Sequence, residues 1–515
     1  MPSILATVEP RLLNSLDYVV IAIYFALNLG IGWWCARKHQ SADDYLRGGG
    51  KTSWWAAGIS FFATGASSIS FMAIPAKTYA TDWLSFGSVP AQGGATLIVA
   101  FVFVALLRRL NITTVFEYLE MRFNRAVRLL CAVLTLLLKI FGRMSIVMLL
   151  PSLALSTVTG LNVYVSILLI GGVTIVYSIV GGYDAVIWTD VMQVCVTFGG
   201  VAIALAFVFL AVPHGMDGVF QIAHENQKLH AISWDWDLTQ PTVIVFLGMA
   251  WGSVFTQLSD QPLMQRVFST SDVKAAKRSV ALGAFFGIST AFVFFFIGTA
   301  LFAFYRIHPE RLTDIPTDAI FPYFIANELP HGVVGAIIAG LFASAMGALS
   351  SNTNSTATIV VTDGYSLLRP KATEKAKVRV ARFATFFSGA AATGMAIYLA
   401  GRGVSSLWDQ FLRLIALIGG GFPGVFALGL LTRRANSGGV IIGALASIGV
   451  TWWVQEFTQT NVFFHTFVAV ASCMIVGYIA SFAFTKEDAR RDLSGLTLWA
   501  KKRPVPVGVP KPVET

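Results

Sequence analysis

The sequence predicts an all-α membrane protein with about 13 transmembrane helices. Three observations carry this prediction. Apolar segments, each long enough to cross a hydrocarbon layer of about 30 Å, recur from residue 15 to residue 484. Hydrophobic residues make up 55% of the chain and charged residues only 12%, which leaves no room for a substantial soluble domain. The basic residues between the segments fit a single orientation in a membrane.

The predicted spans follow one another with short polar separators. Each is a run of roughly 20 predominantly apolar residues. A lipid bilayer requires every backbone polar group to be bonded internally, so we expect each run to be a helix. In chain order the spans are 15–36, 54–81, 86–107, 126–158, 161–181, 184–212, 241–258, 279–305, 332–364, 380–400, 406–431, 438–457 and 463–484.

Basic residues lie mainly on one side of this arrangement. With the N-terminus outside, the basic segments 37–51, 108–128, 266–278 and 369–382 and the tail after residue 485 share one side. Cytoplasmic loops of membrane proteins are enriched in Lys and Arg. We therefore expect a multi-pass protein of the plasma (inner) membrane with its C-terminus in the cytoplasm. The formal charge of +10 then reflects topology and contact with membrane lipids, not nucleic-acid binding.

The second span is unusually polar. It contains Gly58, Gly65, a hydroxyl-rich run from Ser67 to Ser70, and Pro75. Glycine and proline weaken a continuous helix. A helix interrupted near the bilayer midplane frees backbone groups that bind an ion or an anionic substrate. The alternative is a Ser/Gly-rich face that packs against another helix.

Two later spans carry comparable features. Span 332–364 contains a dense polar run from Ser350 to Thr358, which we expect to face protein or a wet cavity because polar groups are costly in lipid. Span 406–431 contains the helix-breaking run Gly419–Gly424. Interrupted spans near the start and the end of a membrane bundle are typical of inverted-repeat secondary transporters.

Two charged residues stand out inside the spans. Asp190 is the acid placed deepest within a span, and a carboxylate there requires a cation or a proton. Arg143 offers a planar guanidinium that suits a carboxylate. The alternative for Arg143 is pairing with an internal acid. The four cysteines all fall inside spans, where we expect them to pack in the apolar core.

Several motifs occur together in a recognisable pattern. They are Ala42–Gly50, Trp54–Ser60, Gly181–Asp190, Asp260-Gln261 with Gln265-Arg266, Asn354–Thr356 and Thr432–Asn436. On these residues the chain resembles the sodium/solute symporter family over nearly its full length. The resemblance implies a leucine-transporter-type fold, with two inverted five-helix repeats and peripheral helices.

The resemblance also implies a division of the chain. An N-terminal tail, the first peripheral helix and a cytoplasmic loop occupy 1–53. The first inverted repeat covers 54–212, an extracellular loop 213–240 and the second inverted repeat 241–431. Two peripheral helices occupy 432–484, and a cytoplasmic tail follows at 485–515.

Within the family, the stretch Phe61–Trp83 looks most like bacterial sialic acid transporters. The resemblance implies that Arg143, which follows a glycine, holds a substrate carboxylate, and that Ser67 and Ser70 contact polar groups of the substrate. Phe86 is expected to pack on the apolar part of the substrate.

One substrate-binding residue of those relatives has no clear counterpart. They carry a glutamine just after the second span, where this chain has Phe86-Gly87-Ser88-Val89-Pro90, with Gln92 slightly later. Another carboxylate-bearing or sugar-like solute therefore remains an alternative.

Only some of the family's sodium ligands have counterparts in this chain. The resemblance implies a main sodium site on the backbone carbonyls of Ala63, Ala66 and Ser344, completed by an adjacent hydroxyl pair. Here that pair falls on Gly347-Ala348, and neither residue has a hydroxyl. Sodium is a hard cation that prefers oxygen ligands, so we expect this site to be weakened.

A second sodium site, found in some members of the family, is matched by Asp190, Ser350 and Ser351. We expect coupling through that site. A proton on Asp190, or no coupling at all, remains open.

The expected function is symport of a small organic solute, coupled to a cation that we take to be sodium. The solute is expected to be an anionic, carboxylate-bearing sugar such as sialic acid. One alternative is a proton-coupled or uncoupled transporter of another carboxylate or sugar, and another is a transporter-like solute sensor. No enzyme activity is expected, since neither a metal-ligand cluster nor a nucleophile elbow is visible. No cofactor is expected apart from sodium as the coupling ion.

Overall fold

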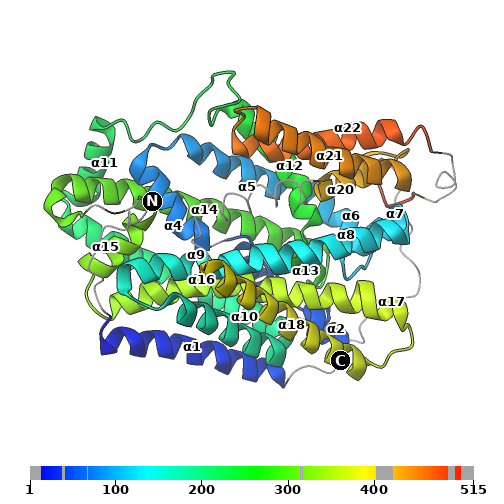
Figure 1. Cartoon of the computed structure of the whole chain (residues 1–515), viewed down its shortest axis with the longest axis horizontal. Helices are drawn as coiled ribbons and strands as arrows, with labels where there is room; N and C mark the ends of the chain where they lie inside the picture. The colour runs from blue at the N-terminus through cyan, green and yellow to red at the C-terminus, as the bar shows by residue number, and fades with distance from the viewer. Residues whose placement is uncertain are drawn as a thin grey trace.

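The structure is a computed structural model that describes residues 13–37, 41–66, 68–313, 315, 317–401, 421–484 and 493–499. Within these ranges the regular secondary structure is helical, and a single isolated β-bridge pairs Thr52 with Thr270. By length and composition, nine of the described helices are able to cross a membrane, or eleven if each of two bent pairs is one span. Most of the long helices run side by side along the long axis of the molecule (Figure 1). The predicted all-α membrane class is confirmed.

The first half of the chain follows the predicted spans closely. Two π-helical turns, Val99–Phe103 and Lys139–Arg143, join α5 to α6 and α8 to α9 within single spans. The helices are α1 (Ser15–Ala36), α2 (Ala42–Arg47), α3 (Trp54–Gly65), α4 (Ser68–Ala80), α5 (Ser88–Ile98), α6 (Val104–Arg109), α7 (Val115–Arg122), α8 (Arg125–Leu138), α9 (Met144–Thr159), α10 (Val163–Ala211) and α11 (Gly215–Glu225).

The helix α10 covers two predicted spans, 161–181 and 184–212, without a gap in the helix assignment. The chain changes direction at Gly182, whose φ of 52° lies in the left-handed region. A Cβ atom at this position would lie only 2.8 Å from the Tyr45 ring and 2.9 Å from the Tyr45 carbonyl oxygen. Glycine is required here by both the backbone conformation and the close approach of α2.

The second half begins at α12 and ends at α22. The helix α16 continues through a π-helical turn, Val360–Tyr365, into α17. Most of the predicted span 406–431 lies outside the described residues, so the number of thirteen spans stays a prediction. The helices are α12 (Val243–Ser259), α13 (Gln261–Phe268), α14 (Val273–Ile307), α15 (Ile320–Glu328), α16 (Val333–Ile359), α17 (Ser366–Leu368), α18 (Glu374–Ala400), α20 (Gly421–Leu431), α21 (Ser437–Phe457) and α22 (Val462–Ala480).

Two spans are broken and bent. The chain turns by 60° between α3 and α4, which confirms the predicted interruption of the second span. It turns by 65° between α12 and α13, at a break that the sequence analysis missed. Asp260 separates these two helices, and Pro262 stands in the first turn of α13, where its missing N–H costs no helical hydrogen bond.

The helix α16 forms the centre of the bundle. It packs against α10, α1, α18 and α9. Almost every residue from Val334 to Ile359 is buried, including the polar run that begins at Ser350. The prediction that this run faces protein or a cavity is therefore confirmed. In Figure 1 α1 lies at one edge of the bundle, and α21 and α22 lie at the opposite edge.

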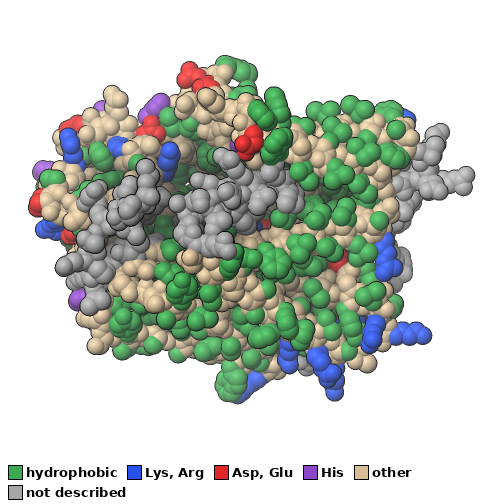
Figure 2. Space-filling model, viewed as in Figure 1, with side chains coloured by type: hydrophobic (Ala, Val, Ile, Leu, Met, Phe, Trp, Pro, Cys, Tyr) green, Lys and Arg blue, Asp and Glu red, His purple; other side chains and the backbone are tan. Residues whose placement is uncertain are grey.

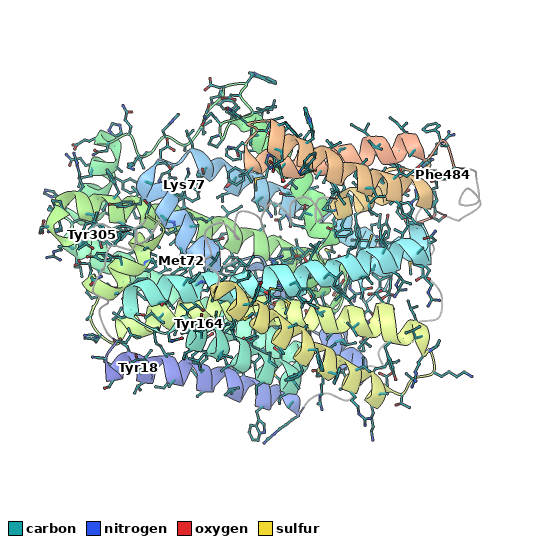
Figure 3. The ribbon with its side chains drawn as sticks, viewed as in Figure 1. Tyr18, Met72, Lys77, Tyr164, Tyr305 and Phe484 are labelled. Atoms are coloured by element: carbon teal, nitrogen blue, oxygen red, sulfur yellow. The ribbon has the colours of Figure 1, made fainter. Side chains whose placement is uncertain are left out.

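The face of the molecule shown in Figure 2 is apolar over much of its area, as a lipid-facing surface requires. Tyr18 of α1 and Tyr164 of α10 are 51% and 44% exposed (Figure 3). Cys35, Cys131 and Cys473 are buried as expected, whereas Cys195 is exposed. The expectation that Cys195 packs in the core was wrong, because it lies on an outward face of α10.

The two ends of the bundle differ in charge. In Figure 2 Lys and Arg side chains gather at the lower right, and acidic, basic and histidine side chains mix at the left end. The right end holds the short helices α2 and α17, and the left end holds α11 and α15 (Figure 1).

Candidate functional site

A cavity of ≈ 320 Å³ opens beside the break between α3 and α4. Its walls also come from α5, α10, α12, α14 and α16. Beyond the break, α4 leads away through Met72 to Lys77 (Figure 3). The end of a helix exposes backbone carbonyls that have no partner within the helix, so a broken span is suited to ligand binding.

Four of the predicted site residues line this cavity. They are Ala63 and Ala66 from α3 and its C-cap, Ser70 from α4, and Ser344 from α16. Gly347, which stands where the family's main sodium site has a hydroxyl, lines it as well. Ser67 lies outside the described residues.

Phe86 is not among the residues that line the cavity. Its ring packs on Trp83 and on Phe295, with centroid distances of 5.1 and 5.2 Å. The expected contact between Phe86 and a substrate stays a prediction.

Arg143 ends the π-helical turn between α8 and α9, and it does not line the cavity. Its Nη2 donates to the carbonyl oxygen of Thr64, in the last turn of α3, at 3.3 Å. Its Nη1 lies 3.3 Å from Asp260 Oδ2. Pairing with an internal acid, the alternative raised from the sequence, is therefore the arrangement in this structure.

Asp260 is shared between two cations. Lys139 Nζ lies 2.7 Å from Asp260 Oδ1, while Arg143 contacts the other oxygen. The side chains of Lys139 and Asp260 are only 9% and 13% exposed. Asp260 belongs to a motif of the sequence, but no role was predicted for it. The nearby Pro262 was the available signal, since proline is favoured in the first turn of a helix.

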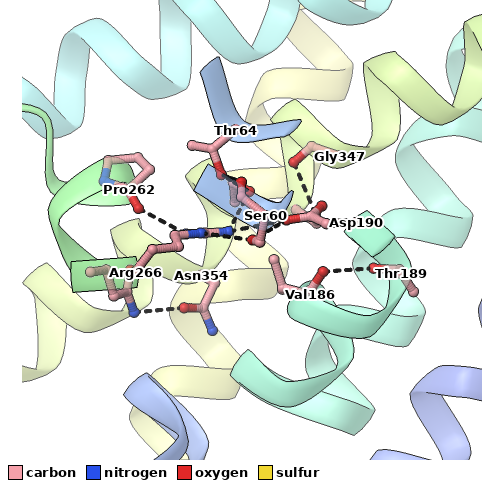
Figure 4. Close-up of polar contacts among 12 residues, drawn as sticks. Ser60, Thr64, Val186, Thr189, Asp190, Pro262, Arg266, Gly347 and Asn354 are labelled. Atoms are coloured by element: carbon pink, nitrogen blue, oxygen red, sulfur yellow. Dashed lines mark hydrogen bonds and ion pairs between the residues drawn. The ribbon is translucent and has the colours of Figure 1, made fainter. Parts of the chain in front are cut away.

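Asp190 is completely buried, and its counter-charge is Arg266 (Figure 4). One carboxylate oxygen, Oδ2, accepts a hydrogen bond from Ser60 Oγ and lies 3.4 Å from Arg266 Nη2. Arg266 is also completely buried. The requirement for a cation at Asp190, inferred from the sequence, is thus met by a residue 76 positions away in the chain.

Arg266 connects several elements through its guanidinium. It donates to Ser60 Oγ at 3.0 Å, to the Pro262 carbonyl at 3.0 Å and to Ser351 Oγ at 2.6 Å. Ser351 Oγ also shares a hydrogen bond with Thr64 Oγ1 at 3.0 Å. The structure therefore brings Asp190 and Ser351, two of the predicted ion ligands, together around Arg266.

Ser350, the third member of that predicted set, makes a local bond instead. Its hydroxyl donates to the Gly347 carbonyl at 3.1 Å. This bond lies within α16.

Two buried oxygens converge on Gly347. Among the described residues, neither Asp190 Oδ1 nor Gln193 Oε1 has a hydrogen-bond partner. A Cβ atom on Gly347 would lie 3.2 Å from the first and 2.6 Å from the second. A carboxylate oxygen and a carboxamide oxygen thus point to the place where the expected hydroxyl is missing. Gln193 was not predicted, although it stands one helical turn after Asp190.

Comparisons with known proteins agree with this arrangement. A family model described as the sodium:solute symporter family matches residues 45–447. The sodium/sialic acid symporter NanT of Aliivibrio fischeri is 33% identical over 506 residues, which cover 96% of this chain and 98% of the relative. The sodium/sialic acid symporter SiaT of Proteus mirabilis is 33% identical over 470 residues, covering 90% and 95%.

Solved structures show the same fold. The substrate-bound, outward-open structure of a Na+-coupled sialic acid symporter has a TM-score of 0.85 at 34% identity, and the match covers 92% of this chain and 98% of that one. Mhp1, a nucleobase-cation-symport-1 family transporter, matches with a TM-score of 0.50 at 15% identity, over 87% and 97% of the chains, and supports the fold alone. The leucine-transporter-type fold is confirmed, whereas the boundaries of the two repeats stay a prediction.

All of these relatives are transporters, so the expectation that the chain is not an enzyme agrees with them. The matched segment contains the cavity, the broken helix and the buried Asp190–Arg266 pair. Together these findings show that the chain belongs to the sodium:solute symporter family.

Proposed function

We propose that this protein is a sodium-coupled symporter that carries sialic acid across the plasma membrane. The observation that carries the proposal is the position of Arg143 against the broken end of α3. Its guanidinium contacts the Thr64 carbonyl beside the cavity, and its side chain is 36% exposed. Relatives over nearly the whole chain are named as sodium/sialic acid symporters, which supports the choice of substrate.

Arg143 would bind the carboxylate of the substrate through its planar fork. Asp260 contacts that guanidinium at 3.3 Å, so a substrate carboxylate at Arg143 would compete with this acid. Ser70, on the cavity wall, and Ser67 would contact polar groups of the substrate. An anionic substrate follows from this chemistry.

The coupling ion would sit near Gly347. Sodium requires several oxygen ligands. Asp190 Oδ1 and Gln193 Oε1 are buried without partners and would supply two of them. The carbonyls of Ala63, Ala66 and Ser344 would supply others. The Gln193 carboxamide would then replace the hydroxyl that Gly347 lacks.

A second candidate is transport that does not depend on sodium. The observation that favours it is the ion pair between Asp190 and Arg266, at 3.4 Å, which already gives the carboxylate a counter-charge. Coupling would then use a proton or be absent.

The orientation follows from charge. The basic end of the bundle, with α2 and α17, would face the cytoplasm and contact anionic lipids, and α11 and α15 would lie outside (Figure 2). The N-terminus would then be extracellular.

Uptake of labelled N-acetylneuraminic acid into proteoliposomes tests the proposal. We expect an inward sodium gradient to drive uptake, and we expect Arg143→Ala and Asp190→Asn to abolish it. Cys195→Ser, an exposed position that does not line the cavity, should behave as the unmodified protein. Uptake that is indifferent to sodium would favour the second candidate, and no uptake under any gradient would discard sialic acid as the substrate.

A further inference from the structure

The cavity has a polar wall that the proposed function does not use. Gln257 of α12 and Thr290 of α14 line it and are only 4% and 7% exposed. In the described part of the chain, no hydrogen-bond partner is found for Gln257 Nε2, Gln257 Oε1 or Thr290 Oγ1. Buried polar groups are nearly always hydrogen-bonded, so three such atoms on one cavity call for an explanation.

Two threonines of the same cavity have hydroxyls that are satisfied by the protein itself. The Thr96 hydroxyl donates to the Gln92 carbonyl on its own helix at 2.9 Å. The Thr197 hydroxyl donates to the Gly340 carbonyl on α16 at 3.2 Å. Gln257 and Thr290 differ from these two threonines, because both line the cavity and carry buried polar atoms for which the described residues offer no partner.

There is room for a ligand at this wall. Gly287 lines the cavity one helical turn before Thr290 and on the same face of α14. A Cβ atom on Gly287 would meet no atom within 4 Å, and the same is true of Gly65 at the end of α3. Open space therefore lies on the face of α14 that carries Thr290, one helical turn from its unpartnered hydroxyl.

The chemistry of the wall is neutral. Among the described residues that line the cavity there is no Asp, Glu, Lys, Arg or His. A carboxamide presents a donor and an acceptor side by side, and a threonine hydroxyl offers one of each. Such a set matches neighbouring hydroxyls on a sugar, in which one hydroxyl donates and the next accepts.

We propose that Gln257 and Thr290 form a hydroxyl-binding subsite, which recognises the neutral, polyhydroxylated part of the substrate. This inference rests on the proposed function, because it takes the cavity as the transport site. The subsite is separate from Arg143, which would hold the carboxylate. A site built to bond hydroxyls rejects analogues that lack them, because its buried polar groups are then left unpaired.

The test compares near-isosteric variants of the full-length protein in detergent. Gln257→Met and Thr290→Val remove the polar atoms, and Thr96→Val is the control, since Thr96 lines the same cavity but bonds its own helix. Binding of N-acetylneuraminic acid is measured at saturating sodium. We expect Kd to rise about tenfold for Gln257→Met and several-fold for Thr290→Val, and to stay within about twofold for Thr96→Val.

Substrate analogues identify which hydroxyl Gln257 binds. A panel of N-acetylneuraminic acid derivatives, each lacking one hydroxyl or having a shortened glycerol chain, is measured against the same variants. We expect one derivative to bind the unmodified protein about tenfold more weakly and to bind Gln257→Met with no additional loss. If every derivative loses as much affinity for Gln257→Met as it loses for the unmodified protein, the subsite is contradicted.

The melting temperature without substrate separates binding from structure. Because the polar atoms lack protein partners, their removal should leave this temperature unchanged or raise it. A fall of several degrees would show that they stabilise the protein, and would overturn the subsite. Unchanged affinity in both variants, with affinity lost in Arg143→Lys, would also overturn it and leave the proposed function standing.

The subsite can be tested even if N-acetylneuraminic acid is not the substrate. If the unmodified protein binds no N-acetylneuraminic acid, neutral sugars and polyols are tested for protection against thermal unfolding. Protection that Gln257→Met removes and Thr96→Val retains would support the subsite, and absence of any protection would overturn it.

Discussion

Lys139 and Asp260 form an almost completely buried ion pair, with Lys139 Nζ 2.7 Å from Asp260 Oδ1. The pair joins the π-helical turn before α9 to the break between α12 and α13. Arg143 contacts the second carboxylate oxygen, so the residue proposed to bind substrate is tied to the same acid.

Asp260→Asn should destabilise the protein and strengthen its affinity for a carboxylate. Loss of the charge leaves Lys139 buried without a counter-charge, which costs about 3–5 kcal/mol at fully buried sites. It also removes the acid that competes for Arg143. We expect a lower melting temperature in detergent together with a lower Kd for N-acetylneuraminic acid.

The double variant Lys139→Met/Asp260→Asn is the control for this prediction. It removes both charges, so most of the lost stability should return while the gain in affinity remains. If Asp260→Asn instead binds the substrate more weakly at unchanged stability, Asp260 is not a competitor of the substrate carboxylate.

Arg266→Lys should lower the unfolding free energy of the protein, although the positive charge is kept. Lysine cannot reproduce the bonds of the guanidinium to Ser60, Ser351 and the Pro262 carbonyl. In a double-variant cycle with Asp190→Asn, we expect the two changes to be non-additive by about 1 kcal/mol or more in unfolding free energy. Additive effects would mean that the 3.4 Å contact contributes no coupling.

Gly347→Ser restores the missing hydroxyl but should not restore a sodium site. The new Cβ would lie 2.6 Å from Gln193 Oε1, which forces the carboxamide away. We expect sodium-stimulated uptake to fall. Gly199→Ala on α10 is the control, because a Cβ there meets no atom within 4 Å.

Shortening Gln193 should rescue this variant. In Gln193→Ala/Gly347→Ser the clash is gone and the serine hydroxyl replaces the carboxamide as an oxygen ligand. We expect sodium-stimulated uptake to recover in large part, whereas Gln193→Ala alone should lose it. Full activity of Gln193→Ala would exclude this carboxamide from the ion site.

The sequence was informative where a local pattern set the structure. The interruption of the second span was predictable because Gly65, the hydroxyl run and Pro75 lie within a few residues of one another. Asp190 was recognisable as a residue in need of a counter-charge, because a carboxylate inside an apolar span is costly wherever the chain folds.

Tertiary relationships were not predictable in the same way. The partner of Asp190 lies 76 positions away, and the partners of Asp260 come from the π-helical turn between α8 and α9. Sequence periodicity does not reveal which helices meet. Cys195 shows the same limit, since an apolar residue in a span suits both the core and the lipid face.

Lys228→Met should loosen the loop between the two predicted repeats. The Lys228 ammonium donates to the carbonyls of Tyr79 and Thr81, each at 2.7 Å, at the end of α4. It also lies 4.2 Å from the centre of the Phe302 ring on α14. Methionine keeps the apolar stem but leaves both carbonyls without this donor. We expect faster hydrogen exchange in segments 79–84 and 226–232.

The same contacts predict how Lys228→Met should change transport. α4 lines the cavity with Ser70 and Ile74, and Lys228 ties the far end of this helix to α14 and to the loop. Loss of two charge-assisted bonds at a partly buried site costs about 1.5–3 kcal/mol per bond at most. We expect a change in the rate of uptake with little change in Kd for the substrate, because no cavity residue is altered. A large change in Kd with unchanged exchange would show that Lys228 acts on the binding site and not on the loop.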